Sequence, residues 1–289
     1  GIATVILEYA GLIEDFIGFA IVLTSTALGT LLPVFRDSGE LDTPFGKFFM
    51  GAGAIGEFGP ILAISLFLSS MSSFESIMSL VAMAAIAFIA AKIPKWLGGE
   101  RMHSLLLSGQ FSSSQTPMRI TILFLVGLLA VAASLGLDVV LGAFIAGIIF
   151  RLYAPTGAEN AMSLKVEGIG FGFLIPIFFV VSGVNIDIKS IIEDPLPMFV
   201  VVALLLIARG LPQFFIYRKA IPVVRDRVRF SLYVATALPI IVAVTTVQVD
   251  AGIMSSADAA TLVGAGAFSV LLFPLMAYLI GRNKSPAKL

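Results

Sequence analysis

The sequence predicts an all-helical membrane protein that crosses the bilayer many times. Hydrophobic residues make up 58% of the 289 residues and charged residues only 12%, whereas a soluble domain carries about a quarter charged residues. The mean hydropathy is +1.05. The apolar residues lie in runs of roughly twenty, the length that a helix needs to cross about 30 Å of hydrocarbon. Together these features define an all-α polytopic protein embedded in a lipid bilayer.

The composition also excludes several kinds of site. The sequence has no cysteine, so disulfides, thiolate metal sites and cysteine catalysis are excluded. Its formal net charge is zero, which gives no reason to expect a nucleic-acid partner. The sequence has no HExxH motif, no paired intramembrane aspartates and no serine–histidine arrangement. We therefore expect neither an enzyme nor a bound cofactor.

About ten apolar segments are expected to be transmembrane helices. They are 1–13, 16–35, 46–70, 76–94, 117–135, 137–153, 165–184, 196–217, 229–249 and 259–281. The first is too short to span at 1.5 Å per residue, and the chain begins with Gly, so we expect N-terminal helices to be missing. We expect one transmembrane domain over 1–289, with core helices at about 1–94 and 196–281, intervening helices over 117–184 and no soluble domain.

The basic residues predict the orientation of these segments. If the segments alternate in direction, every Lys and Arg except Lys189 and Arg209 falls in a gap on one side of the membrane or in the C-terminal tail. The side rich in Lys and Arg is the cytoplasmic one in multi-pass proteins. We therefore expect a multi-pass protein of the plasma (inner) membrane with a cytoplasmic C-terminus.

The alternation also predicts inverted-topology repeats. The first three segments run opposite to the last three, a plan that places a transport site near the membrane midplane. The middle helix of each triplet is interrupted, at 23–30 and at 236–248. These stretches contain Thr24, Ser25, Thr26 and Gly29 in the first, and Pro239, Thr245 and Thr246 in the second. Released carbonyls and hydroxyls are ligands for hard cations, although such hydroxyls also commonly bond only the preceding turn.

Two ionisable residues lie deep in apolar runs, and such residues are functional by default. Glu57 is near the middle of 46–70, and Arg209 is within 196–217. Because Pro60 has no amide proton, the carbonyl of Gly56 should be an available acceptor beside Glu57. Burial favours the protonated form of a carboxylate, whereas Arg209 stays charged and would be the counter-charge of Glu57. The alternative is an ion pair that only holds two helices together.

Three stretches resemble the monovalent cation:proton antiporter-2 family. LTSTALGTLLPVFRDSGELDTPFGKFFMGAGAIGEFGPILAISLFLSS resembles its central motif block, while GLDVVLGAFIAGIIFRL and FLIPIFFVVSGVNIDI resemble later signature helices. The resemblance covers essentially the whole chain. It implies a fold similar to the sodium/proton antiporters, with two crossed broken helices, a homodimer and an elevator-like motion.

The resemblance also implies roles for single residues. Glu57 falls on the essential ion-binding carboxylate, and Gly56 on a neighbour that is Asp, Asn or Gln in other members. Thr24, Ser25 and Thr26 match the first broken helix, TALPIIVAVTT matches the second, and Arg209 matches the basic residue that faces the site. The chain departs from the family by having Glu at position 57 and Gly at position 56.

These observations give a main hypothesis and two alternatives. The main hypothesis is an antiporter that exchanges Na⁺ or K⁺ for H⁺, with both ions competing for Glu57. One carboxylate suggests one cation for one proton, and hence electroneutral exchange that serves pH and cation balance. The alternatives are a sodium-coupled symporter of an organic anion, and a membrane sensor or accessory subunit that transports nothing.

Overall fold

The computed structural model describes residues 16–68, 73–96, 115–153, 159–184 and 188–282. In these ranges the chain is helical and contains no strand. Eight helices are long and apolar enough to cross a membrane: Ile17–Asp37, Pro44–Leu68, Phe74–Lys92, Thr116–Ser134, Met162–Val184, Leu196–Ile216, Val224–Asp250 and Ser256–Gly281. A polytopic helical membrane protein is thereby confirmed.

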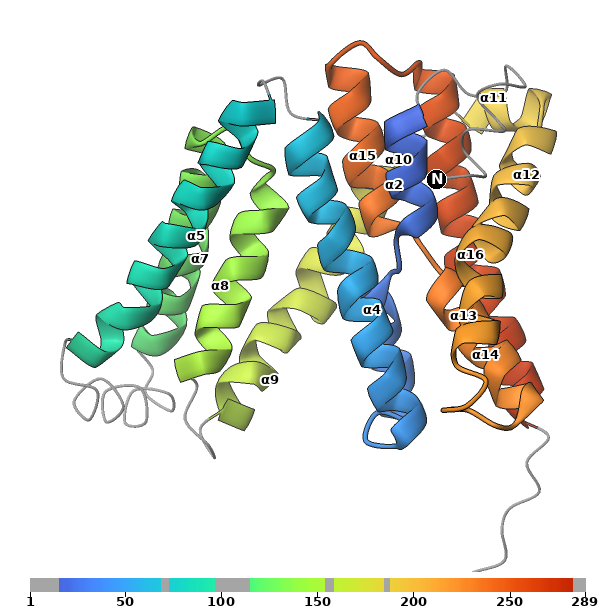
Figure 1. Ribbon diagram of the computed structural model, residues 1–289, viewed down its shortest axis with the longest axis horizontal. Coiled ribbons are helices and arrows are strands. Elements are labelled where there is room, and N and C mark those ends of the chain that lie inside the picture. The colour runs from blue at the N-terminus through green and yellow to red at the C-terminus, as the bar shows by residue number, and fades with distance from the viewer. Residues whose placement is uncertain (1–15, 69–72, 97–114, 154–158, 185–187, 283–289) are drawn as a thin grey trace, which may run out of the picture. The chain divides into compact units, whose positions relative to one another are not determined.

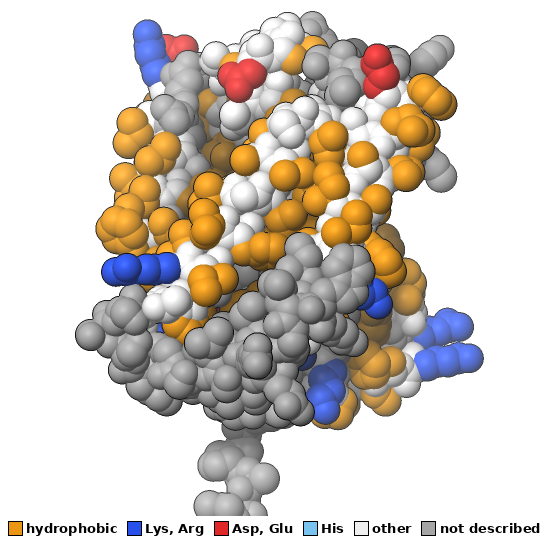
Figure 2. Space-filling view, turned by 90° about the vertical axis from the view of Figure 1, so that its left-hand side faces the viewer, with side chains coloured by type: hydrophobic (Ala, Val, Ile, Leu, Met, Phe, Trp, Pro, Cys, Tyr) orange, Lys and Arg blue, Asp and Glu red, His pale blue; other side chains and the backbone are white. Residues whose placement is uncertain are grey.

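These spans coincide with eight of the ten expected segments. The expected segment 137–153 is a shorter apolar helix, Val139–Leu152, and the expected segment 1–13 lies outside the described residues. The total of ten and the inverted repeats stay predictions. Figure 2 shows one face on which hydrophobic side chains cover the middle, whereas charged side chains lie toward the upper and lower ends. This distribution suits a surface in contact with lipid.

The chain forms two compact units. Unit 1 consists of Gly1–Ile64 and Asn185–Leu289, and unit 2 of Ser65–Val184. The helices of unit 1 are α2 (Phe16–Thr24), α3 (Leu28–Asp37), α4 (Pro44–Ala63), α11 (Ile188–Glu193), α12 (Leu196–Leu205), the π-helical turn η3 (Leu206–Gly210), α13 (Leu211–Ile216), α14 (Val224–Ala235), α15 (Pro239–Asp250) and α16 (Ser256–Arg282). A further π-helical turn, η1 (Ile64–Leu68), follows α4 in the chain.

Unit 2 is built around a close pair of helices. Its elements are α5 (Ser73–Trp96), α7 (Thr116–Ser134), α8 (Val139–Tyr153), α9 (Glu159–Ile169), the π-helical turn η2 (Gly170–Leu174) and α10 (Ile175–Val184). A Cβ on Gly142 of α8 would lie 2.6 Å from the carbonyl oxygen of Leu128 on α7. Small residues of this kind let membrane helices approach closely.

Two long helices of unit 1 are interrupted. The first interruption, Ser25–Ala27, separates α2 from α3, and the second, Thr236–Leu238, separates α14 from α15. Pro239 is the first residue of α15, where its missing N–H and fixed φ are well tolerated. Figure 1 shows α2 beside α15 and α14 beside α16. The interruptions therefore lie inside a packed bundle, where every backbone polar group needs a partner.

Candidate functional site

The two interruptions of unit 1 are in direct contact. The backbone N–H of Ala27, in the first interruption, donates to the carbonyl oxygen of Thr236, in the second, at 2.7 Å. The backbone N–H of Thr26 donates to the carbonyl oxygen of Gly56 on α4 at 2.9 Å. Pro60 lacks the amide that would otherwise occupy that carbonyl. The acceptor expected from Pro60 is therefore present, and it anchors the first interruption to the helix that carries Glu57.

Thr26 joins four elements through its side chain and backbone. Its hydroxyl is fully buried and donates to the carbonyl oxygen of Val234 on α14 at 2.8 Å. The same oxygen accepts a hydrogen bond from Nε of Arg209 at 3.0 Å. With the bond to Gly56, one residue connects the first interruption to α4, α14 and η3.

Gly56 and Gly53 form a shallow surface on α4 that receives the first interruption. A Cβ on Gly56 would overlap Nη2 of Arg209 and lie 2.6 Å from Oγ1 of Thr26. A Cβ on Gly53 would lie 2.7 Å from Cδ1 of Leu28, the first residue of α3. Position 56 thus has no room for any side chain while Arg209 and Thr26 stay in place.

Arg209 lies in the π-helical turn η3 and reaches toward α4. The N–H of Leu211 donates to the carbonyl oxygen of Leu206 across this wider turn, and Pro212 lacks the amide that an α-helix would use here. Nη2 of Arg209 donates to the carbonyl oxygen of Ala52 on α4 at 3.2 Å. The guanidinium is therefore held by neutral oxygens of α4 and of the first interruption.

The carboxylate of Glu57 lies beside the start of α3. Its half-buried side chain lies beside the backbone amide of Gly29, and a Cβ on Gly29 would be 3.9 Å from Oε1 of Glu57. The exposed amides at a helix N-terminus attract negative charge. Lys189 forms an ion pair with Glu193, and Arg229 forms ion pairs with Glu40 and Asp226. Within the described ranges, no ion pair joins Arg209 to Glu57. The role of Arg209 as counter-charge stays a prediction.

The remaining predicted residues divide between the site and its surroundings. Thr24 and Ser25 lie at the end of α2, where their hydroxyls donate to the carbonyls of Ile21 and Val22 at 2.9 and 2.8 Å. Thr245 and Thr246 lie inside α15, beyond the second interruption. Thr245 donates to the carbonyl of Ile241 at 2.9 Å, and Thr246 is exposed. Among the three consecutive hydroxyl residues, the structure brings only Thr26 to Gly56 and Arg209.

Ser269 supports the second interruption and was not among the predicted residues. This buried serine of α16 accepts a hydrogen bond from the N–H of Ala237 at 3.1 Å and is 3.0 Å from its carbonyl oxygen. It also donates to the carbonyl of Gly266 at 2.7 Å. Its sequence signal is weak, because it is one hydroxyl within a long apolar helix.

The fold and the site define a class of protein. A half-buried carboxylate beside interrupted membrane helices is the kind of arrangement that secondary transporters use for ions. No group of three or more His, Cys, Asp or Glu able to hold a metal ion occurs in the part of the chain that the structure describes.

Comparison with known proteins agrees with this class. The family model described as "Sodium/hydrogen exchanger, transmembrane" matches residues 1–278, and the chain belongs to that family. It is 25% identical over 212 residues to the "Putative Na(+)/H(+) antiporter YjbQ" of Bacillus subtilis (strain 168), which covers 72% of this chain and 33% of that protein. It is 23% identical over 186 residues to the "Na(+)/H(+) antiporter" of Enterococcus hirae, which covers 63% of this chain and 47% of that protein. The matches thus span about a third and about half of these relatives.

Proposed function

We propose that the chain exchanges a monovalent cation, Na⁺ or K⁺, for H⁺ across the membrane. Membership of the sodium/hydrogen exchanger family supports the proposal. The observation that carries it is the position of Glu57, a half-buried carboxylate in a membrane-length helix whose neighbours Gly53 and Gly56 receive the interrupted helix. The names of the relatives from B. subtilis and E. hirae point to the same reaction.

In this mechanism, the proton and the cation compete for Glu57. A bare carboxylate is expensive to move through a medium of low dielectric constant, whereas a protonated or cation-bound carboxylate is neutral. Only the two loaded forms would then cross, which couples the two fluxes. Pro33 lacks the amide proton that would bond the carbonyl of Gly29 within α3, so the first turn of α3 offers a neutral oxygen as a candidate ligand for the cation.

The exchange is proposed to be electroneutral. Arg209 and Thr26 fill the space over Gly56, so no second carboxylate fits at position 56. Arg209 keeps its charge in both loaded forms, so the same charge crosses in each direction. We also propose a homodimer in the plasma membrane with a cytoplasmic C-terminus, acting in pH and cation balance. These last points rest on the antiporter-2 resemblance and on the distribution of basic residues.

The test is a flux assay in proteoliposomes that contain a pH-sensitive dye. Gradients of Na⁺, K⁺ or Li⁺ should move protons through the wild-type chain, and Glu57→Gln should abolish that movement because it cannot bind or release the proton. Glu57→Asp keeps a carboxylate and should retain part of the flux. Glu193→Gln changes an exposed residue of the Lys189 ion pair and should behave as wild type.

Three results would overturn the proposal. Full exchange by Glu57→Gln would exclude the competition mechanism. Proton movement that requires an added organic anion would favour a symporter. Stabilisation of the wild-type chain by cations without any flux would favour a sensor.

A further inference from the structure

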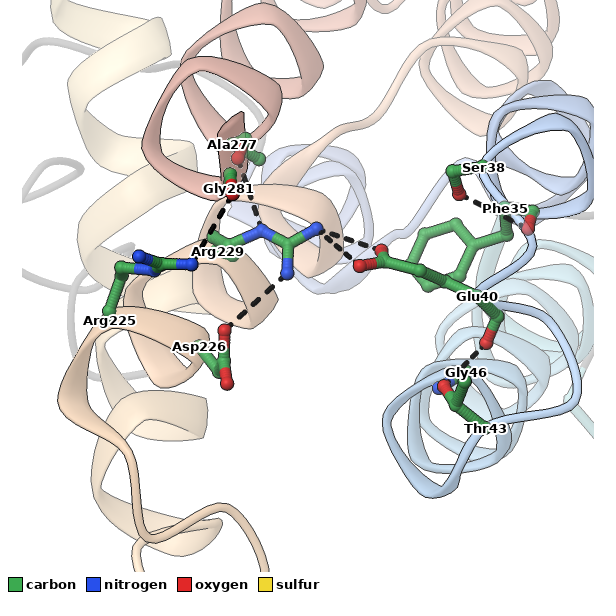
Figure 3. A network of polar contacts seen from close by, with 10 residues as sticks. All are labelled: Phe35, Ser38, Glu40, Thr43, Gly46, Arg225, Asp226, Arg229, Ala277 and Gly281. Carbon is green, nitrogen blue, oxygen red and sulfur yellow. Dashed lines mark hydrogen bonds and ion pairs between the residues drawn. The ribbon is translucent and has the colours of Figure 1, made fainter. Parts of the chain in front are cut away.

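A second ionic group lies in unit 1, and the proposed exchange does not use it. Nη2 of Arg229, on α14, donates to both carboxylate oxygens of Glu40 at 2.8 Å, and Nη1 donates to Asp226 at 3.4 Å. Figure 3 shows Arg229 between the turn that carries Glu40 and the end of α16. Arg229 is only 6% exposed. A buried charge is tolerated only when it has good partners. The elements that carry Arg229 and Glu40 are therefore held in their relative positions by this ion pair.

Glu40 is fixed in the turn that links α3 to α4. Its N–H donates to the carbonyl of Phe35 at 2.9 Å, and its own carbonyl accepts from Oγ1 of Thr43 at 2.6 Å. Oγ1 of Thr43 in turn accepts from the N–H of Gly46 at 3.1 Å and caps α4. Glu40 therefore lies in a turn that is hydrogen-bonded to both α3 and α4. Its ion pair with Arg229 connects that turn to α14.

The other side of Arg229 is tied to α16. Nε of Arg229 donates to the carbonyl of Ala277 at 3.2 Å, and Nη2 of the neighbouring Arg225 donates to the carbonyl of Gly281 at 3.3 Å. A Cβ on Gly281 would lie 2.8 Å from Nε of Arg229. Both arginines thereby bind carbonyls near the C-terminal end of α16. Gly281 is in the last turn of the helix, where carbonyls lack partners within the helix.

An aromatic cluster packs the same elements together. The ring of Phe35 on α3 stacks on Phe49 of α4 at 4.2 Å between centroids and meets the edge of Tyr233 on α14 at 4.8 Å. The guanidinium of Arg229 lies 5.1 Å from the ring centroid of Phe45 on α4. Because packed interiors have little free volume, a shift of one of these rings would move the neighbouring helices of the cluster.

We propose that Glu40 and Arg229 are positioning residues for the Glu57 site. Helix α3 is held to α14 by the bond from Ala27 to Thr236 at its start, by the rings of Phe35 and Tyr233 near its end, and by the Glu40–Arg229 pair just beyond its end. The first turn of α3 carries Gly29, which lies beside Glu57. Loss of the distant pair frees α3 to tilt, which alters the approach of Gly29 to the carboxylate. Neither residue is assigned contact with the transported ion, and the inference rests on the proposed function.

Steady-state exchange at varied Na⁺ in proteoliposomes tests this role. Glu40→Gln should raise the apparent KM for Na⁺ by about fivefold or more, a usual size for coupling between separate sites, and should lower the maximal rate less. Asp226→Asn removes only the longer contact, which lies within α14, and should have a smaller effect. Glu193→Gln is the matched control on an exposed pair. The charge-swapped double variant Glu40→Arg with Arg229→Glu should recover most of the wild-type KM.

An unchanged KM in folded Glu40→Gln would overturn the positioning role. If Glu40→Gln does not fold, Glu40→Asp and the swapped variant decide the matter, because a structural pair alone would leave the KM of the folded variants at the wild-type value. A wild-type chain that moves no protons defeats the proposed function instead. In that case the quantity to measure is the Na⁺ concentration that gives half of the maximal thermal stabilisation. If this concentration is the same in Glu40→Gln or Glu40→Asp as in wild type, the positioning role is overturned separately.

Discussion

At the scale of single residues, the shape of the site depends on Gly56, which has no side chain. Glu57 and Gly56 are neighbours on α4, but successive residues of a helix point about 100° apart. Gly56 accordingly faces Thr26 and Arg209, whereas Glu57 faces Gly29. The guanidinium occupies the volume that a residue at position 56 would need. The lack of a polar neighbour for Glu57 thus has a steric reason in this chain.

This crowding predicts that Gly56→Ala destabilises the protein. Overpacking of a filled site typically costs about 1–3 kcal/mol, and thermal unfolding in detergent should show a lower midpoint than wild type. Gly51→Ala is the matched control, since a Cβ there meets nothing within 4 Å on the same helix. Combining Gly56→Ala with Arg209→Ala should recover part of the loss. Equal unfolding midpoints for Gly56→Ala and Gly51→Ala would contradict the steric account.

At the scale of elements, the two interruptions are supported differently. The first is held by α4, through the carbonyl that Pro60 leaves available. The second is held by α16, through the hydroxyl of Ser269, which accepts a hydrogen bond from the N–H of Ala237. In both cases a neighbouring helix supplies the partner that the missing helical bonds would have supplied. Each interrupted helix is therefore stable only within the bundle.

The second interruption gives a prediction about Ser269. Ser269→Ala leaves the buried N–H of Ala237 without that partner, and an unsatisfied buried group costs about 1–3 kcal/mol. We expect a lower unfolding midpoint together with slower Na⁺/H⁺ exchange. Thr261→Ala, which removes an exposed hydroxyl bond on the same helix, should change neither. A wild-type midpoint in Ser269→Ala would show that the interruption does not depend on this hydroxyl.

Much of this arrangement follows from local sequence, and some of it does not. The apolar runs predicted the spans, and Pro60 predicted the acceptor at Gly56. The extent of each interruption was harder to predict, because the hydroxyls of Ser25 and Thr245 bond carbonyls of the preceding helical turn, as such residues often do. The direction of Arg209 depends on the π-helical turn and on packing against Thr26, 183 positions away in sequence. Such contacts are set by how helices rotate against one another, which one helix's sequence does not specify.

At the scale of the whole molecule, a single carboxylate predicts the stoichiometry. One Na⁺ exchanged for one H⁺ carries no net charge, so the gradients should balance when the two concentration ratios are equal. In proteoliposomes, the pH difference reached at a fixed Na⁺ gradient should not change when a membrane potential is imposed. A shift of that balance point with potential would show that more than one charge moves per cycle.

The π-helical turn η3 makes the site sensitive to chain length. A π-helical turn contains one residue more than the α-helical turn it replaces. Deleting one residue between Leu206 and Arg209 would restore regular α-helix with little change in the directions of the flanking segments, and Arg209 would take another position around the turn. Arg209 would then leave Thr26 and Ala52 with no change in amino-acid type at any of these three positions. A comparison of relatives by residue identity alone would miss that difference, whereas the count of residues before Pro212 would reveal it.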